Sequence, residues 1–289
     1  AKRSAKKDLA EGRQAFASAL GLFDTKLAQA ASEEGARRRQ EQPSSDQVRS
    51  AAVGRAPMLW ARRPDRHGFL DLRLGTADLP TRNEVELPDG KTAIPELMED
   101  LMEVVDRHHL IPEVPAVASL VTAGVVGVSG KTEDVLGTAR SLVTQVAALH
   151  SPAEVLIGGL FSMSTAPAWD WLKWLPHVTS DHSPLEVDLL ACGPAAGQLV
   201  GALRTLIADR SGSQAGSESS AGGPKVGRLP AVVVIVENDV PVDRPALVDL
   251  AERGPVAGVF LIWVSPTVSA LPAAAKAFVA HDLATSHAM

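Results

Sequence analysis

The stretch "GVVGVSGKTEDVLGT" (124–138) decides the fold, because it joins an apolar run to a helical pattern through glycines. Residues 116–128 are rich in β-branched and small apolar side chains, as in a strand. Residues 133–149 place apolar side chains on one helical face, at Leu136, Ala139, Val143 and Val146. A strand that leads through glycines into a helix is the setting of a phosphate-binding loop. The sequence therefore predicts a strand–loop–helix unit and leaves open whether it holds a nucleotide.

Strands and helices alternate on either side of this unit. The runs 231–236 and 257–264 are apolar throughout, which is typical of parallel strands covered on both faces. Further strands are predicted at 68–75 and 154–160, helices at 95–109, 196–208, 244–253 and 271–280, and a flexible glycine- and serine-rich loop at 211–227. This alternation predicts an α/β fold with a mostly parallel sheet between two layers of helices.

The amino-terminal part has a different pattern. Residues 4–40 lack proline, and their larger apolar side chains step by four and three positions, at Phe16, Leu20, Phe23, Leu27 and Ala30. These positions form a narrow seam on an otherwise polar helix, so the helix needs a packing partner or acts as a stalk. We predict a helical stalk over 1–48, closed by the polar stretch 41–47, and an α/β domain over 49–289.

Charge and composition narrow the class of protein. The net charge of −6 divides into +6 over residues 1–63 and −12 over the remainder. A basic arm suits an anionic membrane surface or a solvated helix, whereas the acidic body argues against nucleic acid as a partner. The single cysteine, Cys192, excludes an intramolecular disulfide framework and a cysteine-rich zinc site, and it suits a reducing compartment.

The phosphate-binding motif is incomplete in this loop. A working loop has a glycine, four residues, and then Gly-Lys-Ser/Thr, but Val125 occupies the position of the first glycine. The candidate cofactor-binding residues are Gly127, Ser129, Gly130, Lys131 and Thr132, with the lysine on the phosphates and the Thr132 hydroxyl on Mg²⁺. Glu133 and Asp134 follow in the first helical turn, where they favour the helix dipole and repel a triphosphate.

A nucleotide site of this kind also needs an apolar strand that ends in acid. The stretch "VVVIVEND" places Glu237 where a metal-supporting acid belongs and Asn238 where a catalytic glutamate belongs. An amide cannot accept a proton from water at neutral pH, so we assign no catalytic residue and expect weak or no hydrolysis. Glu237 and Thr132 are the candidate metal ligands. A polar turn after a strand explains the same residues equally well.

Four stretches carry a resemblance to a known family: "MLWARRPDRHGFLDLRLGTADLP" (58–80), "LHSPAEVLIGGL" (149–160), "WDWLKWLPHVTSD" (169–181) and "GVFLIWVSPTVSALPAAAKAFV" (258–279). Together they resemble EccC, the FtsK/SpoIIIE-like membrane ATPase of actinobacterial type VII secretion. The chain is similar to the stalk and the first ATPase module of that family, a module long called a domain of unknown function. The cluster of Trp169, Trp171 and Trp174 is the most specific part.

The resemblance implies a RecA-like P-loop ATPase fold preceded by a helical stalk. It implies partners among the other subunits of a type VII secretion complex, a hexamer in the full-length protein and tethering to the membrane through upstream segments. It places the chain at the cytoplasmic face of the bacterial inner membrane. It also implies a worn nucleotide site, so ATP and Mg²⁺ are the candidate cofactors and their absence is the expectation.

Three hypotheses follow for function. The leading one is a degenerate module that couples the stalk to later, active modules for protein export, with Lys131 paired to Glu237 or Asp239 in the empty site. The second is a slow but genuine Mg-ATP-binding ATPase. The third is a protein-interaction scaffold that uses the 4–40 helix and the tryptophans. All three assume that the loop after Ser129 lies directly beside the end of the strand that terminates at Val236.

Overall fold

A computed structural model describes residues 2–87, 94–212, 229–281 and 286–288. The chain divides into two units, of which the first comprises Ala1–Gln42 and Gly75–Ala116 and the second Pro43–Leu74 and Val117–Met289. The domain boundary expected after residue 48 stays a prediction. The loop expected at 211–227 lies, beyond its first two residues, outside the described part of the chain.

Unit 1 contains a long helix, a shorter helix and most of a two-stranded ribbon. These are α1 (Lys2–Glu41), α3 (Pro95–Arg107), and strands β1 (Asp71–Pro80) and β2 (Leu110–Ser119), both of which continue into unit 2. All five seam positions of α1 are half-buried, and α3 packs along the same helix. The predicted helices at 4–40 and 95–109 are therefore confirmed. No helix of the described residues is both long and apolar enough to cross a bilayer.

A buried ion pair fixes the carboxyl-terminal part of α1. The Glu34 carboxylate lies 2.5 Å from the Arg38 guanidinium, and both side chains are about 5% exposed. Glu34 also accepts hydrogen bonds from the Thr81 hydroxyl at 2.7 Å and the Arg82 backbone N–H at 2.9 Å. Burial raises the pKa of Glu34, but the hydrogen bonds from Thr81, Arg82 and Arg38 outweigh it and hold the pKa below its usual value.

Unit 2 is built on a sheet in the order β5-β4-β6-β7-β3-β8-β9. The first six strands in this order pair in parallel, and β9 is antiparallel to β8. The strands are β3 (Val125–Ser129), β4 (Val155–Phe161), β5 (Leu190–Cys192), β6 (Ala231–Glu237), β7 (Val259–Ser265), β8 (Ala277–His281) and β9 (Ser286–Ala288). The predicted parallel α/β fold is confirmed.

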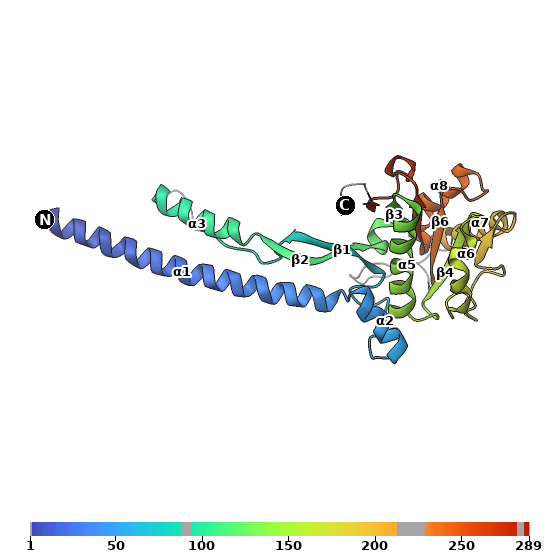
Figure 1. Ribbon diagram of the computed structural model, residues 1–289, viewed down its shortest axis with the longest axis horizontal. Coiled ribbons are helices and arrows are strands. Elements are labelled where there is room, and N and C mark those ends of the chain that lie inside the picture. Colours follow the sequence, from blue (N-terminus) through green and yellow to red (C-terminus); the bar gives the residue numbers. More distant parts are fainter. Residues whose placement is uncertain (1, 88–93, 213–228, 282–285, 289) are drawn as a thin grey trace. The chain divides into compact units, whose positions relative to one another are not determined.

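Helices cover both faces of this sheet (Figure 1). On one face, α5 (Thr132–Leu149), α6 (Ala166–Trp169) and the 3₁₀ helix η1 (Asp170–Trp174) pack against alternate residues of the strands, such as Val233 and Ile235. On the other face, α7 (Ala195–Gly212) and α8 (Arg244–Arg253) pack against the intervening residues, such as Val234 and Val236. Because successive strand residues point to opposite faces, a strand buried on both sides must be apolar throughout.

The helix predicted at 271–280 is wrong. The 3₁₀ helix η4 (Val268–Ala270) precedes an extended chain, and β8 pairs in parallel with β3, with Val126 opposite Ala277 and Val128 opposite Val279. Alanine favours a helix, but strand formation depends on the neighbouring strand and on packing, and here the pairing with β3 outweighs the local preference.

Several short elements are absent from the sequence-based prediction. Helix α2 (Ser45–Gly54) begins with a capping box between Ser44 and Gln47, a signal that the polar stretch 41–47 contained. Other unpredicted elements are α4 (Leu120–Ala123) and the 3₁₀ helix η3 (Pro255–Ala257), together with β5, β9, α6, η1 and η4.

Side chains from the carboxyl-terminal half of α5 hold the base of β1. The buried Gln145 amide donates to the Arg73 carbonyl at 3.0 Å and accepts from the Arg73 N–H at 2.8 Å. His150, directly after α5, accepts from the Leu70 N–H at 3.0 Å through Nε2, so its Nδ1–H donates to the Val146 carbonyl at 3.0 Å. These bonds require a neutral imidazole, and burial lowers the pKa of His150 to about 3.

Because of His150, the folded state should become less stable as the pH falls. In the unfolded chain the imidazole takes up a proton below about pH 6.5, whereas the folded state resists protonation down to about pH 3, so stability is lost as pH falls through this window. We expect this residue to lower the free energy of unfolding by about 2 kcal/mol between pH 8 and pH 5. Urea unfolding at both pH values measures this loss. In His150→Gln, which is neutral throughout, the loss should be smaller by that amount, and an equal loss in both proteins would contradict the assignment.

Candidate functional site

The connection between β3 and α5 is too short to wrap a triphosphate. Strand β3 ends at Ser129 and α5 begins at Thr132, so only Gly130 and Lys131 join them. The Gly130 N–H donates to the Ser265 carbonyl of β7 at 3.2 Å and is not free for a ligand. Gly130 has φ +138°, and a Cβ there would lie 2.7 Å from the His281 carbonyl oxygen, so glycine is required by the backbone itself.

The predicted binding residues separate into three groups. Gly130 and Thr132 line a pocket. Gly127 and Ser129 lie in β3; a Cβ on Gly127 would meet Leu271 at 2.7 Å, and Ser129 is buried, so both serve the packing of the sheet. Lys131 is exposed and forms no ion pair with the described residues. The expected pair between Lys131 and Glu237 or Asp239 is thus not found in the described part of the chain.

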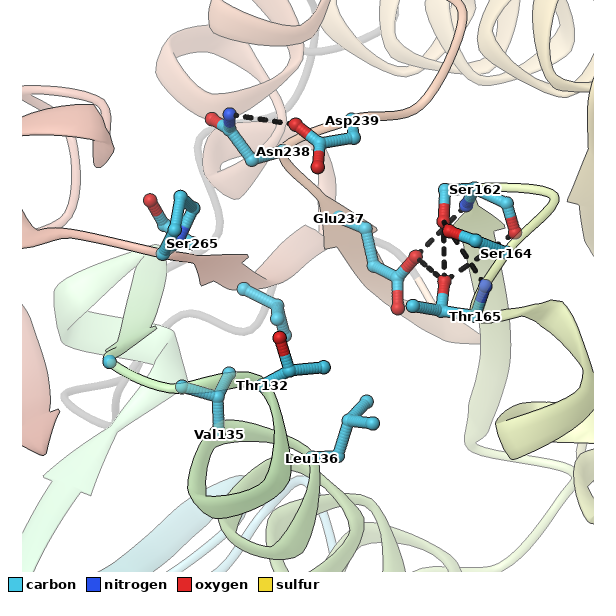
Figure 2. Close-up of a pocket in the computed structure, with 13 residues that line it drawn as sticks. Thr132, Val135, Leu136, Ser162, Ser164, Thr165, Glu237, Asn238, Asp239 and Ser265 are labelled. Carbon is cyan, nitrogen blue, oxygen red and sulfur yellow. Dashed lines mark hydrogen bonds between the residues drawn. The ribbon is translucent and has the colours of Figure 1, made fainter.

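The pocket has a volume of about 370 Å³ and lies at the carboxyl ends of the strands (Figure 2). Ligands of open parallel sheets bind at such ends. The lining residues come from the start of α5 and from the ends of β4, β6 and β7: Gly130, Thr132, Val135, Leu136, Ser162, Ser164, Thr165, Glu237, Asn238, Asp239, Val264, Ser265 and Pro266. The loop does not lie directly beside the end of β6, as the sequence analysis assumed, because β7 is inserted between β3 and β6.

Glu237 is bound by the protein itself. Its carboxylate, only 5% exposed, accepts hydrogen bonds from the Ser162 N–H at 2.9 Å, from the Thr165 hydroxyl and from the Trp169 indole N–H at 2.8 Å. Figure 2 shows Ser162 and Thr165 on the side of Glu237 away from Asn238. All three donors are neutral, and no described cation pairs with this carboxylate. Burial of a carboxylate without hydrogen-bond partners is unfavourable, so these three bonds offset the free energy lost when Glu237 leaves water.

The side chain of Asn238 is engaged by its neighbours. Its side-chain oxygen accepts from the Arg244 guanidinium at 3.0 Å, and its amide donates to Asp239 at 3.3 Å. Arg244 also donates to the Ala270 carbonyl at 2.6 Å and stacks over the ring of Trp263 at 5.7 Å. The position expected to carry a catalytic glutamate is therefore part of a structural hydrogen-bond network.

The sequence analysis missed Ser162, Thr165 and Trp169 as partners of the acid. The tryptophan cluster was recognised as the most specific part of the resemblance. Trp169 is almost fully buried, with its ring stacked on Phe161 at a centroid distance of 5.2 Å. The partners of Glu237 could have been found from the parallel register of β4 and β6. This register places Leu160 opposite Val236 and so brings the residues that follow the two strands together.

The residues present match an Mg-ATP site poorly. A triphosphate needs several backbone N–H groups, and here the short connection leaves those at the start of α5, a turn that carries the exposed carboxylates Glu133 and Asp134. A metal at Glu237 would have to compete with three hydrogen bonds. Among the described residues no group of three or more His, Cys, Asp or Glu side chains is arranged to hold a metal ion.

The topology and the pocket define unit 2 as an α/β module with a mostly parallel sheet and a pocket at the carboxyl ends of its strands. No family model matches the sequence. Curated relatives do match: the chain is 37% identical over 142 residues to the ESX-4 secretion system protein EccC4 of Mycobacterium tuberculosis, covering 48% of this chain and 11% of that protein. It is 35% identical over 149 residues to EccC of Thermomonospora curvata, covering 50% and 10%. The chain is thus a homologue of the EccC proteins of type VII secretion systems, and the resemblance is confirmed.

The chain spans about a tenth of the length of these relatives. Among solved structures, the ATPase 2 and 3 region of Thermomonospora curvata EccC, in complex with a signal sequence peptide, aligns at TM-score 0.49 and 19% identity, covering 78% of this chain and 38% of that one.

Replacement of Glu237 should destabilise unit 2. Glu237→Ala leaves the buried N–H groups of Ser162 and Trp169 without an acceptor and removes one partner of the Thr165 hydroxyl, and we expect the free energy of unfolding to fall by about 2–5 kcal/mol. Asp239→Ala is the matched control, because Asp239 lines the same pocket but is exposed, and its removal should change stability by less than about 0.5 kcal/mol. Chemical denaturation of both variants measures the difference. Equal effects would show that Glu237 is not a structural residue.

Proposed function

We propose that this chain is a module of a type VII secretion motor that does not hydrolyse ATP and that transmits force or conformational change between a helical stalk and further ATPase modules. The observation that carries the proposal is the state of Glu237, whose two oxygens are engaged by Ser162, Thr165 and Trp169. An acid used in this way stabilises the module, and a metal ion or a water molecule would have to compete with these bonds.

Two further observations support the same conclusion. The connection through Gly130 and Lys131 offers few backbone donors to a phosphate, and Asn238 lacks the basicity to activate water. The extended α1 and the ribbon of unit 1 provide the stalk. The partners would be other subunits of the secretion complex, with a hexameric full-length protein tethered by upstream segments at the cytoplasmic face of the inner membrane.

A second candidate function is Mg-ATP binding with slow turnover. It is favoured by the position of Thr132, whose hydroxyl lines the pocket opposite Glu237 (Figure 2), and by the first turn of α5, which has no side-chain cap. Lys131 would then contact the phosphates, and Glu237 would exchange a hydrogen bond for the metal. A third candidate, a scaffold for protein contacts, needs only the surface of unit 1 and the exposed Trp174.

Thermal unfolding with and without millimolar Mg-ATP tests the proposal. A ligand present at 100 times its Kd adds about 2.7 kcal/mol to stability. We expect no change in Tm for the natural chain and none for Lys131→Ala, because Lys131 is exposed and has no described ionic partner. A rise in Tm that Lys131→Ala abolishes would show that Mg-ATP binds at this loop, and release of phosphate from ATP by the natural chain but not by Lys131→Ala would establish the second candidate and overturn the proposal.

A further inference from the structure

The three donors to Glu237 all come from one piece of chain. This piece, residues 162–174, is named here the tryptophan segment; it begins where β4 ends and contains α6 and η1. Its Ser162, Thr165 and Trp169 all bond to one carboxylate on β6. Glu237, which lines the pocket, thus holds the tryptophan segment through these bonds. The far end of the segment, Trp174, is 80% exposed.

Helix α5, whose first turn lines the pocket, also bonds to the tryptophan segment. The Arg140 guanidinium of α5 donates to the Ala168 carbonyl at 3.0 Å. The first turn of the same helix contributes Val135 and Leu136 to the pocket wall. Both elements that hold the segment, α5 and β6, are therefore walls of the pocket, and a shift of either wall acts on the segment.

The hydrogen bonds of Glu237 are unevenly shared between its oxygens. Oε2 accepts from both Ser162 and Thr165, whereas Oε1 accepts from Trp169 only, among the described residues. Since each carboxylate oxygen can accept about two hydrogen bonds, the remaining capacity is on Oε1. A cation or a charged donor in the pocket would bind Oε1 more strongly than the neutral indole N–H does, so the carboxylate would turn toward it and the bond from Trp169 would weaken.

We infer that Glu237 couples the pocket to the tryptophan segment, so that a ligand presenting a cation or a charged hydrogen-bond donor to Oε1 releases the Trp169 indole N–H and loosens the segment around it. The inference goes beyond the proposed function, because it holds whether or not a nucleotide binds. The stack of Trp169 on Phe161 and the buried Leu172 keep the segment folded after release, so the change is local.

Hydrogen exchange of the natural chain and of single-residue variants tests the inference. The reporters are the N–H groups of Ala166 and Ala168, which donate to the Ser162 and Thr165 carbonyls at 3.0 and 2.8 Å. In Trp169→Phe, which keeps an aromatic ring but loses the donor, we expect them to exchange at least about tenfold faster, as the loss of one buried hydrogen bond implies.

Trp171→Phe is the matched control. It makes the same change in the same segment, but the Trp171 indole N–H is buried without a hydrogen-bond partner among the described residues. Its exchange rates should stay within about threefold of the natural chain. The Val232 N–H, in the core of β6, reports global unfolding, and changes it shares with Ala166 and Ala168 are subtracted. Equal acceleration in the two variants would overturn the inference.

A variant in the pocket wall tests the coupling itself. Leu136→Lys places an ammonium group in the pocket without altering any donor to Glu237, whereas Leu136→Met keeps an apolar wall. We expect Leu136→Lys, but not Leu136→Met, to accelerate exchange at Ala166 and Ala168 at least about threefold, because a charge-assisted bond displaces a neutral one. If Trp169→Phe accelerates exchange and Leu136→Lys does not, the segment is held by Glu237 but does not respond to the pocket, and the inference fails.

Discussion

The arrangement of unit 2 depends on a negative charge buried without a described cation. The carboxylate of Glu237 is stable at the end of β6 because one segment of chain supplies three neutral donors to it. Three features of the surrounding structure bring these donors to the acid. The pairing of β4 with β6 places Ser162 within reach of it. The chain then turns so that Thr165 and Trp169 face the acid, and the burial of the Trp169 ring brings its N–H inward. The tryptophan that marks the family resemblance is thus part of the environment of the acid.

The same site keeps the order of strand, glycine and helix that a phosphate-binding unit has. Strand β3, the glycine after it and helix α5 keep the order of a nucleotide-binding unit, but the glycine serves the contact with β7 and β8. The exposed Glu133 and Asp134 provide the negative charge that the positive end of α5 favours. Asn238, bonded to Arg244, belongs to the same pattern, because the position next to the acid also contributes to packing.

The sequence predicted what depends on local pattern and missed what depends on distant neighbours. The apolar runs of β6 and β7 and the periodicity of α1, α3, α5 and α8 were sufficient, because burial on one or both faces leaves a mark on every residue. The strand β8 was mistaken for a helix, since its alanines are extended only through pairing with β3. The insertion of β7 between β3 and β6, and the donors to Glu237, are matters of topology that no periodicity encodes. In unit 1, the bonds between Glu34 and residues that follow β1 were unpredictable for the same reason.

The Gln145 side chain, which bonds to both backbone groups of Arg73, has an effect on how the chain can evolve. Because the Gln145 side chain bonds to both backbone groups of Arg73, it acts like a residue of a neighbouring strand paired with β1. It thereby fixes the register of β1 relative to α5. A slip of one residue would turn Leu72 from the core toward water and break both bonds at once. Insertion or deletion of a single residue just before Arg73 would shift this register and break the two bonds from Gln145.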